Sequence, residues 1–216
     1  MVNEMLMGRV GVQGSGVSVR AGRWIVALAL AAGLSGCAGG GLVSSPPPDT
    51  YGLSAAPAVA GQRARNRQIL ISEPAALKAL DSEQIVIRPT PSAIQYLANS
   101  QWSDRLPNIV QDKLVQAFEN SGQVGGVGRP GDGLAIDFKI ITAIRAFEIK
   151  ADRGERAMVE LSVKILNDRN GVVVATRVFG ASTPVTGSGN AAYVQSLDRA
   201  FETVVQDIVS WTLSRI

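Results

Sequence analysis

Three stretches with strand character lie between two amphipathic helical patterns in this chain, and their order restricts the fold more than any other feature. Apolar and polar residues alternate over residues 134–140 and again over residues 157–165, and a third strand is expected over residues 172–179. The dipeptide Asn170-Gly171 between the last two stretches is a strong signal for a β-hairpin. We therefore expect these three segments to form an antiparallel meander.

Each flanking helix carries one apolar stripe. The first helix is expected to begin at Ser103, whose side chain can cap free backbone N–H groups, and to end at Gly122, where a left-handed residue fits. Asn190 is expected to cap the second helix. The residues expected to form the stripes are Leu106, Ile109, Val110, Leu114, Ala117 and Phe118 in the first helix, and Val194, Leu197, Phe201, Val204, Val205, Ile208 and Trp211 in the second. Because such helices need a sheet to cover, we predict an α+β fold with both helices packed on a mostly antiparallel sheet, as a single domain over residues 51–216.

Shorter strand-like stretches come before the first helix. Strands are expected over residues 51–53, 69–71, 84–88 and 94–97. Residues 55–68 have the composition of a loop, and residues 75–80 fit either one helical turn or an extended segment. The alternation slips in phase at residues 140–141, so a β-bulge is expected there.

The tetrapeptide Leu34-Ser35-Gly36-Cys37 is typical of a bacterial lipobox. It ends an apolar run over residues 24–34, and Arg20 and Arg23 precede this run. The run is too short to span about 30 Å of hydrocarbon, which needs roughly 20 residues. A charged region, a short apolar region and small residues at a cleavage site mark a secretory signal. We therefore predict a lipoprotein signal peptide over residues 1–36 and lipidation of the Cys37 thiol by acyl chains such as palmitate.

Two other interpretations of Cys37 stay open at this point: a cleaved signal beside an unrelated cysteine, and a short membrane anchor. If Cys37 becomes the lipidated first residue, residues 37–50 form a Gly/Pro-rich tether, which is flexible at first and stiffer at residues 46–48. Such a tether would hold a domain away from a membrane surface. Met5 or Met7 is an alternative start of the chain.

The composition argues against most kinds of catalysis. The chain contains no histidine and one cysteine. The absence of histidine excludes Ser-His-Asp and Cys-His mechanisms, histidine-ligated zinc and the commonest general base. Removal of residues 1–36 leaves 18 basic and 17 acidic residues, so no basic footprint for nucleic acid remains. We therefore predict that the protein is not an enzyme and has no metal site, no cofactor and no nucleic-acid partner.

Several local patterns resemble site motifs, and each has a simpler interpretation. Residues 126–131 match G-x-G-x-x-G, but they lead into a strand rather than the helix that a dinucleotide site needs. Ser188 lies between two glycines without the spacing of a nucleophile elbow. Asp137 and Glu148 could form an acid/base pair, but we predict isolated carboxylates on the polar, solvent-exposed faces of strands. Asp132 is expected to be a turn residue.

Two aromatic residues before the first helix are candidates for a partner surface. Tyr96 and Trp102 either anchor a partner or form the edge of the core. The last helix leaves a similar choice, because its broad stripe fits one packed face alone or a packed face together with an oligomer contact.

A family resemblance is carried by many short segments taken together. They are residues 69–74, Ala79-Leu80-Asp81, residues 85–89, Ile94-Gln95-Tyr96-Leu97, Trp102-Ser103-Asp104-Arg105-Leu106-Pro107, residues 115–122, Arg145-Ala146-Phe147, Arg177-Val178-Phe179 and residues 191–211. With the lipobox, they resemble the ABC-type transport auxiliary lipoprotein family, which includes the paraquat-inducible lipoprotein C group. The resemblance covers most of residues 51–211.

The resemblance implies a docking or binding subunit rather than an enzyme. Members of the family accompany an MCE-domain (mammalian cell entry) protein and an ABC permease with its ATPase, in systems that move phospholipid or other hydrophobic molecules between the inner and outer membranes. A homo-oligomer, such as a ring around a tubular MCE partner, is an arrangement that the family suggests.

The resemblance also implies a location. The protein would be anchored by lipid in the inner leaflet of the outer membrane and would face the periplasm; Ala38 after the lipidated cysteine, in place of aspartate, agrees with this sorting. The alternative function is that of an outer-membrane lipoprotein that binds and regulates a cell-wall synthase or another envelope complex.

Overall fold

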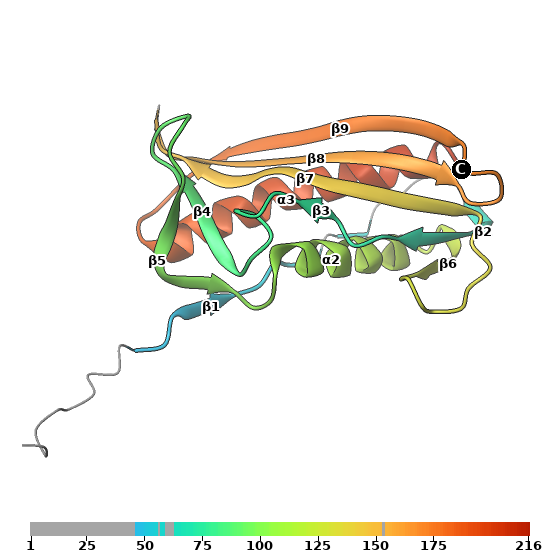
Figure 1. Cartoon of the computed structure of the whole chain (residues 1–216), viewed down its shortest axis with the longest axis horizontal. Coiled ribbons are helices and arrows are strands. Elements are labelled where there is room, and N and C mark those ends of the chain that lie inside the picture. Colours follow the sequence, from blue (N-terminus) through green and yellow to red (C-terminus); the bar gives the residue numbers. More distant parts are fainter. Residues whose placement is uncertain (1–45, 56, 59–62, 153) are drawn as a thin grey trace, which may run out of the picture. The chain divides into compact units, whose positions relative to one another are not determined.

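Three long antiparallel strands form the centre of the folded unit, which extends from Pro47 to Ile216. They are β7 (Phe138–Lys150), β8 (Arg156–Asn167) and β9 (Val173–Pro184), and Figure 1 shows them side by side. The computed structural model describes residues 46–55, 57–58, 63–152 and 154–216. The predicted meander is confirmed, because β7 pairs with β8 and β8 pairs with β9 in antiparallel register.

The inner face of β8 is the clearest case of sequence pattern becoming structure. Its alternating apolar residues are fully buried, and they are Ala157, Val159, Leu161, Val163 and Ile165. The β8–β9 hairpin turns at Gly171, whose φ of +71° is a conformation that glycine adopts without strain. The Asn167 N–H donates to the Val172 carbonyl at 2.8 Å and closes this turn.

The other edge of β7 pairs with three successive short strands. These are β2 (Ala64–Ile71), β3 (Ala75–Ala76) and β4 (Gln84–Arg88), and all three run parallel to β7. Pro74 has no backbone N–H and lies at the break between β2 and β3. The chain therefore covers one long strand in three pieces.

Three further strands complete a mixed sheet. They are β1 (Asp49–Tyr51), parallel to β5; β5 (Gln95–Trp102), antiparallel to β4; and β6 (Val124–Gly128), parallel to β2. Five of the eight pairings among the described strands are parallel. The α+β class with a single domain is therefore right, but the prediction of a mostly antiparallel sheet holds only in part. Strand patterns show which face is buried, and they do not show which neighbour pairs at each edge.

The two helices cover different parts of this sheet. Helix α3 (Asn190–Leu213) packs on β8 and β9, helix α2 (Leu106–Ser121) packs on β6 and β2, and the helices contact each other. Figure 1 shows α3 running along the three long strands. All residues predicted for the two apolar stripes are buried in one core. Burial of apolar area at about 25 cal/mol per Å² is the main favourable contribution to the stability of such an arrangement.

The ends of the helices differ from the predictions in two of three places. Gly122 ends α2 in the left-handed conformation with φ of +60°, as predicted. Ser103 does not cap α2, because Arg105 is the residue that precedes the helix and no side-chain cap hydrogen bond forms there. The Ser103 N–H donates to the Tyr51 carbonyl at 2.7 Å and so joins this segment to β1. Asn190 is the first residue of α3 rather than its cap. Its Nδ2 donates to the Ala98 carbonyl at 2.9 Å, and so it joins α3 to β5.

Several strand boundaries also differ from the predicted ones. The first strand ends at Tyr51 instead of starting there, and β2 begins at Ala64, inside the predicted loop. β5 extends to Trp102, well beyond the predicted residues 94–97. The register shift in β7 lies between Ile144 and Ala146 rather than at residues 140–141. These boundaries depend on strand partners that local alternation does not encode.

Candidate functional site

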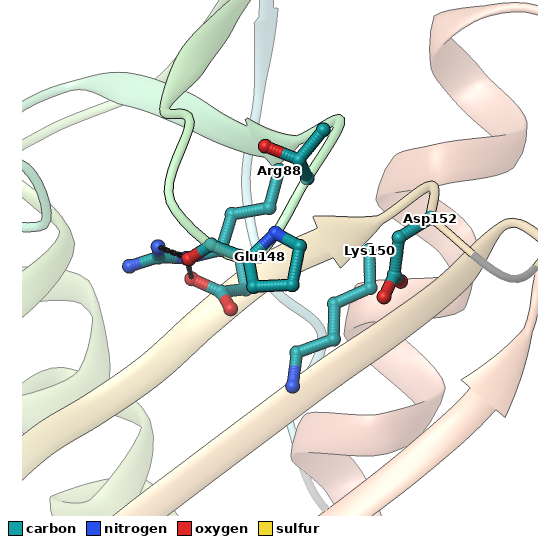
Figure 2. Close-up of a pocket in the computed structure, with 6 residues that line it drawn as sticks. Arg88, Glu148, Lys150 and Asp152 are labelled. Atoms are coloured by element: carbon teal, nitrogen blue, oxygen red, sulfur yellow. Dashed lines mark hydrogen bonds and ion pairs between the residues drawn. The ribbon is translucent and has the colours of Figure 1, made fainter.

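A charged pocket lies where the carboxyl ends of β4 and β7 meet. The parallel register pairs Val86 with Glu148 and Arg88 with Lys150, which brings the Arg88 and Glu148 side chains together. Arg88 Nε donates to Glu148 Oε2 at 2.6 Å, and Arg88 Nη1 donates to the Pro91 carbonyl at 3.1 Å (Figure 2). One guanidinium therefore joins two strands and the segment that links β4 to β5.

Glu148 is buried although it lies on the sheet face opposite the main core. It pairs with Met158, whereas Ala157 and Val159 on either side of Met158 are fully buried in the core. The Glu148 side chain is 6% exposed and the Arg88 side chain is 29% exposed. Burial of a carboxylate costs free energy unless a partner compensates the charge. Arg88 supplies that compensation, because its Nε donates to the Glu148 carboxylate at 2.6 Å.

The rest of the pocket presents groups that remain available to a partner. Its volume is about 200 Å³, and Thr90 and Pro91 line it together with Lys150 and Asp152 from the end of β7. Figure 2 shows that Lys150 extends away from the Arg88–Glu148 pair. Neither Lys150 nor Asp152 forms an ion pair with another described residue. The volume is below the roughly 300–1,000 Å³ of typical small-molecule sites, so the pocket fits a side chain of a partner better than a lipid.

A second buried carboxylate lies just before the other end of β7. Asp137 Oδ2 accepts a hydrogen bond from the Gln68 N–H at 3.0 Å, and Asp137 Oδ1 accepts one from Arg169 Nη2 at 2.6 Å. The Gln68 N–H lowers the pKa of Asp137 below its ordinary value, and Arg169 lowers it further against the opposing effect of burial. Asp137 thus fastens the β8–β9 hairpin to β2.

These positions correct the prediction for the two acids. Asp137 and Glu148 are not isolated carboxylates on solvent-exposed strand faces, because both are buried and each is paired with an arginine. Their partners come from segments that are distant in sequence, which the local pattern does not show. The two acids also lie near opposite ends of β7, more than about 30 Å apart at 3.3 Å per residue, so they do not form an acid/base pair.

Tyr96 and Trp102 have different environments although both lie on β5. Trp102 is 1% exposed and packs edge-to-face on Phe147, with ring centroids 5.7 Å apart. The Phe147 ring in turn packs against the Phe201 ring of α3, with ring centroids 5.6 Å apart. Trp102 therefore belongs to the core, the second of its two predicted alternatives. Tyr96 is 42% exposed and stays available to a partner.

The remaining motif residues do not gather into a reactive site. Gly126 and Gly128 lie in β6, and the chain continues through a turn to β7 rather than into a helix. In this turn Asp132 Oδ2 accepts the Arg129 N–H at 2.7 Å, as expected for a turn residue. Ser188 lies in the link between β9 and α3. Within the described ranges, no group of three acidic or cysteine side chains is placed to hold a metal ion.

One surface was missed by the sequence analysis. Val172, Val173, Val174 and Val178 are exposed, and β9 pairs with β8 but with no other described strand. A run of three valines before Arg177 was the available signal. We expected a strand over residues 172–179, but the residue pattern gave no sign that this strand lies at an edge.

The predicted lipidation site cannot be placed. Cys37, the signal over residues 1–36 and the tether up to Ser45 lie outside the described residues. In the part of the chain that the structure describes, no helix is both long enough and apolar enough to cross a membrane.

Comparison with known proteins gives evidence about the family of this chain, which the geometry of the pocket does not provide. The model of a family described as the ABC-type transport auxiliary lipoprotein component matches residues 51–209, which include α2, most of α3 and all strands from β2 to β9. This match covers well over half of the chain and confirms the resemblance inferred from the sequence.

A curated relative and two solved structures are similar to this chain. An uncharacterised protein of Bradyrhizobium diazoefficiens is 30% identical over 145 residues, which are 67% of this chain and only 39% of that protein. A crystal structure from Xanthomonas campestris, assigned to the DUF330 family, is 28% identical with a TM-score of 0.70, and the match covers 77% of this chain and 95% of that one. A second solved structure, of an uncharacterised protein, shares the fold at 15% identity and a TM-score of 0.63, with 77% of this chain and 99% of that one covered.

Proposed function

Because the chain belongs to the ABC-type transport auxiliary lipoprotein family, we propose that it is the lipid-anchored docking subunit of an ABC/MCE-type transporter. The observation that carries this proposal is the family match over residues 51–209. In this role the protein binds an MCE-domain protein and, through it, the permease and ATPase. The transporter would move phospholipid or other hydrophobic molecules between the inner and outer membranes.

Membership of a lipoprotein family makes this a membrane-anchored envelope protein. The finer location that we propose is the inner leaflet of the outer membrane, with the folded unit in the periplasm. Acylation of Cys37 would supply the anchor, since several acyl chains hold a protein far more firmly than one. The part of the predicted 37–50 tether that precedes β1, which begins at Asp49, would then set the reach of the folded unit and its effective concentration near a partner.

Binding rather than catalysis is the proposed mode of action. The charged pocket around Arg88 and Glu148 offers Lys150 and Asp152 to a partner, and its small volume supports contact with side chains rather than with lipid cargo. The chain has no histidine to serve as a general base. Energy from ATP would enter through another subunit.

Co-purification from the native membrane tests this function. The full-length chain with a C-terminal affinity tag would be extracted in mild detergent, and the bound proteins would be identified by mass spectrometry. We expect an MCE-domain protein, a permease and an ATPase among the bound proteins. Recovery of a cell-wall synthase instead of these subunits would favour the alternative function.

Two controls separate docking from anchoring. An unrelated acylated lipoprotein with the same tag reports background binding in detergent. A Cys37→Ala variant with the signal replaced by a cleavable one tests whether the folded unit binds the MCE-domain protein without acyl chains. We expect this variant to bind in solution and to be lost from the membrane fraction.

A further inference from the structure

Strand β9 has an unoccupied backbone edge along most of its length. It has twelve residues, pairs with β8 at every residue except Val174, where the register shifts, and pairs with no other strand in the described part of the chain. Free N–H and C=O groups on such an edge can pair with another extended chain.

The register shows which backbone groups face outward. The Val185 N–H donates to the Glu155 carbonyl at 3.0 Å, so this pair is a hydrogen-bonded one. In an antiparallel ladder bonded and non-bonded pairs alternate, so Thr183, Ala181 and Phe179 point their backbone groups toward β8. At the alternate positions the backbone N–H and C=O groups point away from β8. These positions are Thr176, Val178, Gly180 and Ser182. Pro184 also falls at an outward position, where its missing N–H removes nothing from the ladder.

One end of this edge is protected and the middle is open. Pro184 donates no hydrogen bond, and Arg156 Nη2 donates to the Ser182 carbonyl at 3.3 Å. Proline and charged residues are devices that natural sheets use to block edge pairing. The section from Thr176 to Gly180 contains no proline, and its one charged side chain, Arg177, lies over the Phe179 ring at 4.9 Å from the ring centroid. The adjacent valines, together with Val178, are exposed.

The charge around this open section is positive. β9 contains no acidic residue, and neither Arg177 nor Lys164, which lies opposite Thr176, forms an ion pair with a described residue. Glu160, opposite Gly180, is already paired with Arg145 at 3.0 Å. Arg177 and Arg215 line a surface hollow of about 380 Å³ that contains a single carboxylate, Asp207.

We propose that an extended, acidic segment of the MCE-domain partner adds to β9 as a further strand. Backbone groups of residues 176–180 would provide the ladder, the exposed valines would bury apolar side chains of the partner, and Arg177 and Lys164 would pair with its carboxylates. A second copy of the chain fits poorly, because it would bring the basic side chains of two β9 edges to one seam. This inference rests on the proposed function and assigns that function a surface.

Amide hydrogen exchange on the complex tests the inference directly. The full-length chain would be measured alone and with the purified MCE-domain protein in the same detergent. We expect the outward amides of Thr176, Val178 and Gly180 to exchange at least tenfold more slowly in the complex. The amides of Phe179 and Ala181, already bonded to β8, should be slow in both states.

Edge variants give an independent measurement. Val178→Pro removes an outward N–H and leaves the ladder with β8 intact, and Val178→Glu keeps the backbone but places a negative charge against the acidic partner. Both should weaken binding of the MCE-domain protein at least tenfold. If Val178→Pro does not fold, Val178→Glu decides. Leu77→Glu is the matched control, since Leu77 is exposed and lies outside the meander, and it should bind like the unaltered chain.

The possible failures are distinguishable. If the complex forms without protection of β9 and with unchanged affinity for Val178→Glu, the inference is wrong and the proposed function stands. If the unaltered chain forms no complex, both are wrong. If β9 amides are already protected in the isolated chain and its mass doubles, a second copy occupies the edge and the inference is overturned.

Discussion

Arg88 and Glu148 form a 2.6 Å ion pair although they are 60 residues apart, and the pair connects β4 to the central strand β7. Glu148 is the more deeply buried partner. The pair therefore links the stability of the domain to the shape of the charged pocket.

Replacement of Arg88 by methionine should destabilise the domain by about 3 kcal/mol, because it leaves the Glu148 carboxylate buried without a partner. The double variant Arg88→Met with Glu148→Leu should recover much of that loss. Urea unfolding measures both. The control is Arg145→Met, which breaks a more exposed pair with Glu160 and should cost less than about 1 kcal/mol. Equal losses of unfolding free energy in Arg88→Met and Arg145→Met would contradict the structural role of the buried Arg88–Glu148 pair.

Asp137 should make stability depend on pH in the acid range. Its pKa in the folded state is lowered from the ordinary 3.8, first by the Gln68 N–H and then by Arg169. The unfolded state therefore binds a proton more readily, so the contribution is fully present above pH 3.8 and is lost as the pH falls through the lowered value. Urea midpoints between pH 5 and pH 2 should fall less steeply for Asp137→Asn than for the unaltered chain. If the urea midpoint falls equally steeply with pH in both proteins, Asp137 is not the group responsible for the loss of stability in acid.

Gly125→Ala should destabilise the pairing of β6 with β2. A Cβ atom at this position would lie 2.4 Å from the Arg65 carbonyl oxygen, and backbone cannot yield as a side chain can. Overpacking of this kind costs about 1–3 kcal/mol. Gly126→Ala is the matched control, because its nearest neighbour is Gln68 Cγ at 3.6 Å. Thermal unfolding should show a lower midpoint for Gly125→Ala alone.

Trp102 and Tyr96 should respond differently to truncation. Trp102→Ala opens a cavity beside Phe147 and should cost about 3–5 kcal/mol. Tyr96→Ala removes an exposed ring and should change stability by less than about 0.5 kcal/mol. Denaturant unfolding separates the two, and the stable Tyr96 variant can then be tested for binding of the MCE-domain protein. A large loss of stability in Tyr96→Ala would mean that its ring is packed rather than available.

Cys37→Ser should abolish lipidation and signal cleavage. Metabolic labelling with a palmitate analogue should mark the unaltered protein and leave the variant unmarked, with the variant migrating as a larger precursor. Mass spectrometry of the mature N-terminus provides the second measurement. An unaltered protein that starts at another residue with a free thiol would contradict the predicted anchor.

The local patterns of the sequence determined several elements with their buried faces. The stripes of α2 and α3, the alternating residues of β8, the bounds of β4 and the turn at Asn170-Gly171 are as predicted. Each of these features depends on a periodicity or a turn residue within a short window. The family resemblance was recognisable for a similar reason, since it consists of short motifs in a fixed order, and the family match confirms it. The lipobox at Cys37 stays a prediction.

The sequence predicted the β7–β8–β9 meander, but only the tertiary structure decided which strands pair with the other edge of β7. Backbone hydrogen bonds carry no side-chain information, so nothing in the β2, β3 and β4 segments shows that all three run parallel to β7. The same long-range pairing places Arg88 beside Glu148 and leaves β9 at an edge. The candidate site depends on these long-range features. A partner binds a surface that several segments, distant in sequence, form together.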